Sequence, residues 1–114
     1  MIKTKRIYDP PSDKDGKRIL VDRLWPRGIK KDAARIDEWL KDLAPTNELR
    51  KWFGHDPENW AEFKQKYKKE LKRQAEALNR LRKDSKRGRV TLLFAAKDKE
   101  HNNAVALKEI IDQE

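Results

Sequence analysis

One almost wholly apolar run, Val90–Ala96, limits the folds open to this chain more than any other feature. Its residues do not alternate between apolar and polar, which is typical of a strand covered on both faces. A second, shorter run, Ile19–Val21, has the same character and ends in the polar pair Asp22-Arg23. Because strands buried on both faces occur mainly in parallel sheets, the two runs favour a parallel α/β arrangement.

The segments after the second run are predicted to be helical. Apolar residues at helical spacing predict a helix over residues 36–43, which Pro45 ends. Thr46 can cap a second, short helix that runs through Trp52 or Phe53.

Asp56-Pro57 marks the start of a long helix, because a capping carboxylate is followed by proline at the first helical position. Its apolar residues recur every three or four positions until Gly88 ends it, and a last helix follows the run Val90–Ala96. A weak strand, Thr4–Tyr8, precedes these elements. The predicted fold is a single α/β domain, residues 1–114, with a short, mainly parallel three-stranded sheet, about four flanking helices and Rossmann-like topology.

The composition excludes several classes of site. The 114 residues include no cysteine, so disulfides, thiolate nucleophiles and cysteine-bound zinc are ruled out. Neither serine lies in a nucleophile elbow, there is no glycine-rich phosphate loop, and no histidines or acids have metal-ligand spacing, so we expect no metal site. Without a signal peptide or a run of about 20 apolar residues, we expect a cytoplasmic protein that makes no membrane contact.

Three polar segments are the candidate functional regions: Asp22–Gly28, Phe53–Pro57 and Lys97–Asn103. The first and third follow predicted strands directly. In open parallel sheets, ligands bind beyond the carboxyl ends of the strands. We therefore expect the first and third segments to meet in one site, with the second, a break between two helices, as a further candidate.

The first segment carries groups that suit an anion. Arg23 and Arg27 can form paired hydrogen bonds with phosphate or carboxylate, and Trp25 can stack on a ring. The alternative is structural, with Asp22 paired to an arginine and Trp25 packed over the sheet edge.

The third segment is predicted to open the last helix, and a helix N-terminus attracts anions. Lys97, Asn102 and Asn103 add side-chain donors at the same place. The alternative is that Asp98 simply caps the helix while its neighbours face water.

Two histidines are available for proton transfer. His55 or His101 can act as general acid or base, with Asp22 or Asp98 as its partner. The alternative is that the His55-Asp56 pair is a helix cap with the histidine at the surface. Whether a cofactor takes part is left open.

The positive charge is concentrated in one segment. Between Lys64 and Arg89 there are twelve basic and three acidic residues, which accounts for the whole net charge of +9. Such a surface can attract nucleic acid phosphates. Candidate contacts are Lys64, Lys68, Lys72, Arg80, Lys83 and Arg87. The alternative is a solvated helix, because nucleic-acid-binding faces usually place aromatic residues among the basic ones, and here the aromatic residues read as buried.

Several long segments resemble one family. They are RIYDPP (6–11), VDRLWPRG (21–28), DEWLKDLAP (37–45), ELRKWFGHDP (48–57) and RVTLLFAAKDKEHNNA (89–104). With these segments the chain resembles the YeaO-like branch of the family called domain of unknown function 488. The resemblance covers nearly the whole chain, except the unusually basic stretch 74–87. It implies a small α/β domain with a short parallel sheet and no established activity, and its hallmark stretches coincide with the three polar segments.

Three functions follow as hypotheses. The first is an anion-accepting cleft for a small molecule or nucleotide that bears phosphate or carboxylate, with acid/base catalysis as an open question. The second is association with nucleic acid through the basic segment. The third is recognition of a peptide carboxylate. The ligand and the oligomeric state are left open.

Overall fold

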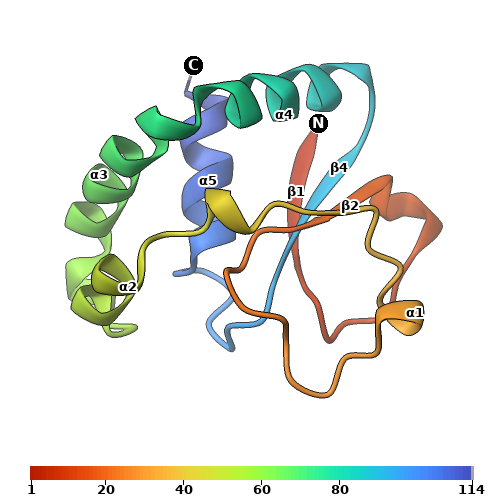
Figure 1. Ribbon diagram of the computed structural model, residues 1–114, viewed down its shortest axis with the longest axis horizontal. Coiled ribbons are helices and arrows are strands. Elements are labelled where there is room, and N and C mark those ends of the chain that lie inside the picture. Colours follow the sequence, from red (N-terminus) through yellow and green to blue (C-terminus); the bar gives the residue numbers. More distant parts are fainter. Residues whose placement is uncertain (114) are drawn as a thin grey trace.

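The computed structural model describes residues 1–113. Its centre is a sheet of four parallel strands, β1 (Ile2–Arg6), β2 (Lys17–Leu20), β3 (Glu38–Trp39) and β4 (Val90–Phe94). The spatial order is β1-β4-β2-β3, so the most apolar strand, β4, lies between β1 and β2 (Figure 1). The predicted α/β class and parallel sheet are confirmed, with four strands in place of three.

The additional strand, β3, lies where we predicted a helix over residues 36–43. β3 instead pairs with β2, and a 3₁₀ turn, Lys41–Leu43, follows it. The helical spacing was misleading because its apolar residues serve two separate cores: Ile36 and Trp39 pack on one face of the sheet, whereas Leu43 is buried on the other. Backbone bonds from Asp37 N to Arg18 O and from Leu40 N to Leu20 O hold this segment along the sheet edge.

The helices are α1 (Lys31–Ala34), α2 (Asn47–Phe53), α3 (Trp60–Leu71), α4 (Ala75–Arg87) and α5 (Asn103–Asp112). The predicted long helix is broken by a 3₁₀ turn, Lys72–Gln74. No glycine or proline marks this break. The change of direction between α3 and α4 lets both helices bury leucines in the same core (Figure 1).

Strand limits also shift slightly from the prediction. β1 spans Ile2–Arg6 where we predicted Thr4–Tyr8, because its register is set by pairing of Ile2 with Val90 and of Arg6 with Phe94. Tyr8 lies beyond the strand and is exposed. Asp56 caps a 3₁₀ turn, Pro57–Asn59, that leads into α3.

The two faces of the sheet are covered differently. Along β2 and β4, alternate residues such as Ile19 and Leu92 face a large core made with α2, α3, α4 and α5. Leu20 and Leu93 face a smaller core closed by α1 and the segment 25–36. Both faces are therefore buried, as the apolar strands predicted. Among residues 1–113, no helix has the length and apolar character needed to cross a bilayer.

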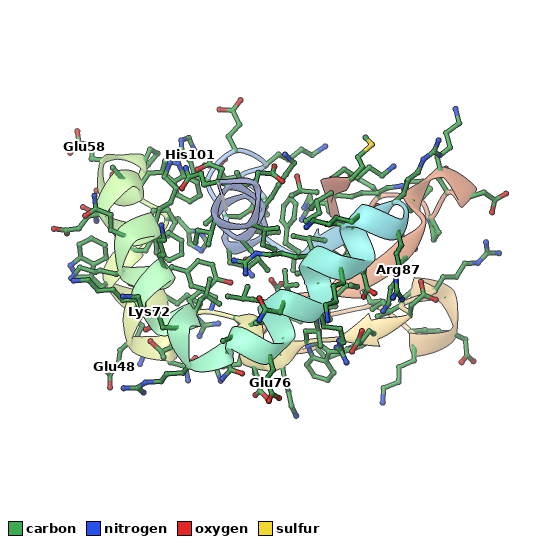
Figure 2. All side chains as sticks on the ribbon, turned by 90° about the horizontal axis from the view of Figure 1, so that it is seen from above. Glu48, Glu58, Lys72, Glu76, Arg87 and His101 are labelled. Atoms are coloured by element: carbon green, nitrogen blue, oxygen red, sulfur yellow. The ribbon has the colours of Figure 1, made fainter. Side chains whose placement is uncertain are left out.

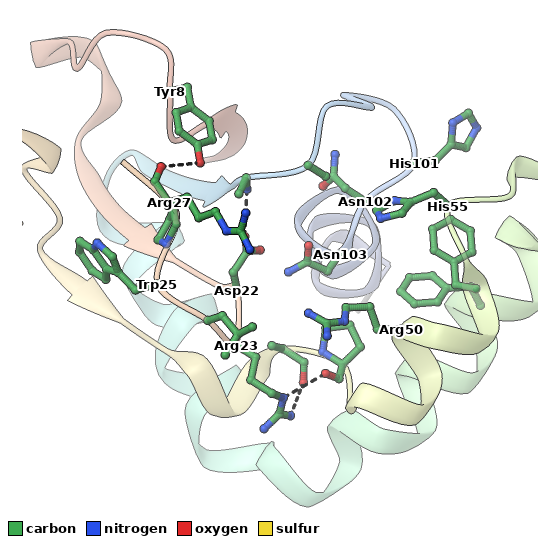
Figure 3. Close-up of a pocket in the computed structure, with 18 residues that line it drawn as sticks. Tyr8, Asp22, Arg23, Trp25, Arg27, Arg50, His55, His101, Asn102 and Asn103 are labelled. Carbon is green, nitrogen blue, oxygen red and sulfur yellow. Dashed lines mark hydrogen bonds between the residues drawn. The ribbon is translucent and has the colours of Figure 1, made fainter. Parts of the chain in front are cut away.

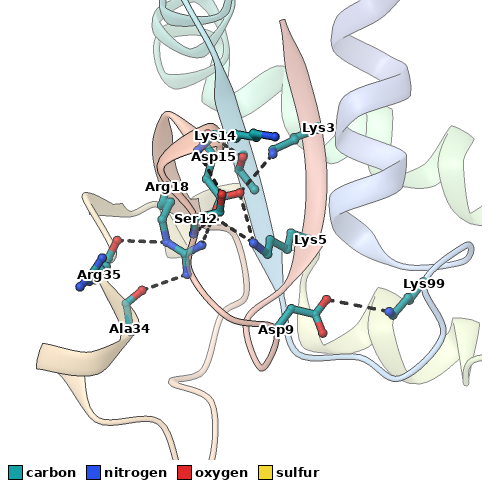
Figure 4. Close-up of polar contacts among 11 residues, drawn as sticks. Lys3, Lys5, Asp9, Ser12, Lys14, Asp15, Arg18, Ala34, Arg35 and Lys99 are labelled. Atoms are coloured by element: carbon teal, nitrogen blue, oxygen red, sulfur yellow. Dashed lines mark hydrogen bonds and ion pairs between the residues drawn. The ribbon is translucent and has the colours of Figure 1, made fainter.

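The amino end of β2 is fixed by a buried carboxylate, Asp15. Arg18 Nη1 lies 2.6 Å from it, Lys3 and Lys5 Nζ atoms each lie 3.1 Å away, and the Ser12 amide also donates to it (Figure 4). Burial raises the pKa of Asp15, but these donors together outweigh burial and hold the pKa well below its usual range. Asp15 was not among the residues that the sequence singled out.

Candidate functional site

A cleft of about 370 Å³ opens at the carboxyl ends of β2 and β4. Parts of all three predicted polar segments line it: residues 22–27, Phe53 with His55, and residues 101–103 (Figure 3). Lys97 and Asp98 lie outside this lining. The structure therefore brings together Asp22, Arg23, Trp25, Arg27, His55, His101, Asn102 and Asn103.

Asp22 lies at the base of the cleft, two residues beyond the end of β2. The Ala95 amide donates to Asp22 Oδ2 at 2.9 Å, and Trp39 Nε1 donates to the Asp22 backbone oxygen at 2.7 Å. Burial raises the pKa of the Asp22 carboxyl, while the Ala95 amide, the Asn103 side chain and the Arg50 charge offset part of this rise. A carboxyl group with a raised pKa in a cleft is a common property of functional sites.

The three arginines of the cleft have different roles. Arg23 donates from Nε and Nη2 to the backbone oxygens of Pro45 and Ala44, both at 3.3 Å. Its guanidinium therefore holds two chain segments together. Within residues 1–113, the guanidinium groups of Arg27 and Arg50 form no hydrogen bond or ion pair, and in Figure 3 they lie on opposite sides of Asp22.

We did not predict Arg50 or Tyr8 as cleft residues. Arg50 is an exposed residue of α2, and its sequence context is that of any helix surface. No pattern in the sequence set it apart from the other exposed cations of the chain. The Tyr8 hydroxyl donates to the Arg27 backbone oxygen at 2.9 Å and so links β1's exit loop to the rim.

His55 is oriented by an uncommon backbone conformation. Gly54 and His55 have φ of 57° and 56°, so two successive residues adopt the left-handed region after α2 ends. For a non-glycine residue this conformation costs about 1–2 kcal/mol. Asp56 caps the following turn through the Glu58 amide, so the predicted alternative of a helix cap is correct for Asp56.

His101 and Asp98 form a pair within the loop after β4. His101 Nδ1 lies 3.0 Å from Asp98 Oδ2, and the amides of Glu100 and His101 donate to Asp98 Oδ1. The Glu100 amide is the main cause of a lowered pKa at Asp98, with the two His101 contacts adding to it. Trp60 contacts the His101 ring edge-on, with centroids 5.3 Å apart, so this ring is held at the rim of the cleft.

The two asparagines are engaged in the fold. Asn102, not Asp98, caps α5: its Oδ1 accepts the Val105 amide at 3.0 Å and its Nδ2 donates to Asp98 O. Asn103 Nδ2 donates to Val21 O at 2.9 Å. Asn102 therefore ties the start of α5 to the loop after β4, and Asn103 holds it against the end of β2.

Trp25 combines a structural contact with its place in the cleft. Its Nε1 donates to Ile29 O at 2.8 Å, and its ring meets Trp39 edge-on at 5.4 Å. The packing that we gave as the alternative is therefore present. Within the described part of the chain, no three histidine or acidic side chains are grouped as a metal site requires.

The basic segment lies along α3 and α4, with Arg87 far from His101 (Figure 2). Two of the six nominated residues are engaged: Lys64 pairs with Glu109 at 2.8 Å, and Arg80 pairs with Glu38. The other four are exposed and have no ion pair within residues 1–113: Lys68, Lys72, Lys83 and Arg87.

Comparison with known proteins identifies the family of this chain. The family model described as the inactive DUF488-N3 subclade matches residues 1–114. The chain is 45% identical to the uncharacterized protein YeaO of Escherichia coli (strain K12) over 106 residues, which is 93% of this chain and 92% of that protein. It is 40% identical to the uncharacterized protein Rv3073c of Mycobacterium tuberculosis (strain ATCC 25618 / H37Rv) over 111 residues, 97% of this chain and 93% of that protein. No solved structure matches it. The chain therefore belongs to the YeaO-like branch of the DUF488 family.

Proposed function

We propose that this chain is a cytoplasmic protein whose cleft binds a small anion or nucleotide through a phosphate or carboxylate group. One observation carries the proposal: two guanidinium groups, those of Arg27 and Arg50, line the same cleft without an ion-pair partner within residues 1–113. Guanidinium groups bind phosphate and carboxylate through charge-assisted hydrogen bonds.

The remaining lining supports a small molecule with an apolar part. Leu24, Phe53 and Phe63 contribute apolar surface, and Leu24 and Tyr8 are among the few exposed large apolar residues of the described chain. A volume of about 370 Å³ lies in the range, roughly 300–1,000 Å³, of small-molecule sites. An anionic group near the arginines and an apolar body along these side chains would match the cleft.

Binding without turnover is favoured over acid/base catalysis. The matching subclade is described as inactive, which we extend to this chain as part of the proposal. The geometry supports it for His55, whose ring has no hydrogen-bonded carboxylate within residues 1–113; of the two histidines, His101 is the one that a carboxylate, Asp98, orients. A general base normally needs such orientation.

The direct test is calorimetric titration with sulfate, formate and adenosine monophosphate. We expect Arg50→Ala to weaken binding about 10- to 100-fold, because a charge-assisted hydrogen bond contributes about 1.5–3 kcal/mol. Lys51→Ala is the matched control, because Lys51 is the next residue of α2, is exposed and lies outside the cleft. Equal losses in the two variants, or no binding of any probe, would refute the proposal.

A second function, nucleic acid binding on the α3–α4 face, is favoured by one observation. Four exposed cations of this face have no intramolecular ion pair among the described residues: Lys68, Lys72, Lys83 and Arg87. Beside them, the Lys66 Nζ atom lies 4.4 Å from the ring centroid of exposed Trp52. Fluorescence anisotropy with single-stranded DNA and RNA tests it, since binding should weaken steeply with salt. Lys68→Gln with Lys72→Gln should weaken binding, and Lys14→Gln with Lys30→Gln should not. Equal effects of both pairs would contradict this second function.

A further inference from the structure

Asp22 is the exception in an otherwise cationic cleft. Of the described residues that line the cleft, Asp22 alone carries a carboxylate, while Arg23, Arg27 and Arg50 carry positive charges. No arginine or lysine in residues 1–113 forms an ion pair with it. A cleft made only to attract anions would not need a carboxylate at its base.

Several groups face Asp22 from the surrounding elements. Arg50 approaches from α2, Asn103 from α5 and the Ala95 amide from the end of β4. From α3, the Tyr67 hydroxyl interacts electrostatically with Asp22, and it donates its hydrogen bond to the Leu43 backbone oxygen. Arg23 and Arg27 follow in the same loop, and Tyr8, His55 and His101 also line the cleft: with Arg50, these are the charged and titratable groups that share the cleft with Asp22.

We propose that the cleft takes up its oxyanion together with one proton, and that Asp22 holds this proton. An oxyanion between Arg27 and Arg50 would lie close to an ionised Asp22 and be repelled by it (Figure 3). Protonation removes the repulsion, and the new O–H group donates a hydrogen bond to the oxyanion. The proton comes from solvent, and no covalent bond of the ligand changes.

The surroundings of Asp22 support this role. Its Oδ2 accepts from the Ala95 amide, which fixes the orientation of the carboxyl group in the cleft. Burial raises the pKa of Asp22, so a proton is held there more readily than on an exposed aspartate. A carboxylic acid kept neutral by an apolar site is a known donor to oxyanions. The ligand class is therefore a carboxylate or phosphate ester that stays ionised while Asp22 is protonated.

This inference rests on the proposed function, and one experiment separates the two. Sulfate and formate are titrated calorimetrically into the whole protein from pH 5 to pH 8, in buffers of different ionisation enthalpy. Uptake of up to one proton is expected in the unaltered chain, with affinity falling up to tenfold for each pH unit above the Asp22 pKa. Asp22→Asn should bind more tightly at pH 8, with most of the proton uptake lost.

Two variants separate Asp22 from the histidines, which also attract protons when an anion binds. His55→Gln and His101→Gln should keep the uptake. Loss of uptake in these variants, with unchanged uptake in Asp22→Asn, would overturn the inference while leaving anion binding intact. If neither probe binds the unaltered protein at any pH, the proposed function itself fails. Carboxyl carbon NMR of Asp22 gives a second readout, since saturating sulfate should move its titration to higher pH.

Discussion

Two carboxylates flank the same strand, and their surroundings differ in kind. Asp15 precedes β2, is fully buried and is bonded by three cations and an amide. Asp22 follows β2, lines the cleft and has no ion pair within residues 1–113. The comparison shows that burial alone does not decide the role of a carboxylate: complete pairing makes Asp15 part of the fold, whereas Asp22 lacks such pairing, as the ligand role proposed for it requires.

The largest expected effect is at Asp15. We expect Asp15→Asn to lower the free energy of unfolding by about 3–5 kcal/mol, because the buried Arg18 charge would lose its carboxylate partner and keep only the Ala34 and Arg35 carbonyl oxygens. Urea denaturation followed by circular dichroism measures the change. The control is Asp13→Asn, since Asp13 is exposed in the same turn and has no ion pair in the described chain. A loss below about 1 kcal/mol would show that the cluster is not structural.

The second expectation concerns acid. The pKa of Asp15 is lowered from 3.8 in the folded state, so its stabilisation is present above pH 3.8 and is lost as the pH falls toward the folded pKa. Unaltered protein should therefore lose stability more steeply below pH 4 than Asp15→Asn does, by up to about 1.4 kcal/mol per pH unit. Urea midpoints between pH 2 and pH 6 measure this. Parallel curves for the two proteins would contradict it.

The third expectation has the opposite sign. The pKa of Asp22 is raised, so its contribution to stability is complete below 3.8 and is lost as the pH rises through the folded pKa. We expect Asp22→Asn to be as stable as the unaltered chain at pH 7, or up to about 1 kcal/mol more stable. The same denaturation series measures it. A loss of several kcal/mol at pH 7 would mean that Asp22 is a structural carboxylate like Asp15.

The smallest expected effect concerns the backbone that orients His55. His55→Gly should change stability by no more than about 1 kcal/mol, because relief of the left-handed conformation is offset by greater freedom of the unfolded chain. Arg35→Gly is the matched control, since Arg35 also has a positive φ, of 48°, and lies outside the cleft. Thermal denaturation should give similar shifts for both, while sulfate titration should change only for His55→Gly. If sulfate affinity changed in both variants, the change would not depend on the place of His55 in the cleft.

The same contrast explains what the sequence could predict. β4 and the carboxyl end of β2 were predicted because apolar runs and the polar residues that follow them are local signals, and parallel strands bring their ends together. Asp15 was not singled out from the sequence, because its partners Lys3, Lys5 and Arg18 come from different elements. β3 exists through pairing with β2, and two residues carry no strand pattern of their own.

The residues of the cleft, too, could be predicted only where a local sequence pattern marks them. Asp22, Arg27 and His55 lie in conspicuous polar segments and were nominated. Arg50 required knowledge of where α2 lies relative to the loop after β2, because a helix-surface arginine has no distinguishing neighbour pattern. Asn102 was nominated for a ligand, yet its amide is used in capping α5. A capping side chain and a ligand-binding side chain at a helix start have the same residue type.

The central claim is that the carboxyl end of the sheet, through Arg27 and Arg50, holds an anion. The most direct measurement is an amide NMR titration of the labelled protein with sulfate at pH 6. We expect saturable shifts in residues 22–28, 50–55 and 95–103, all lost in Arg50→Ala and retained in Lys51→Ala. Shifts that do not saturate, or that occur only along α3 and α4, would contradict it.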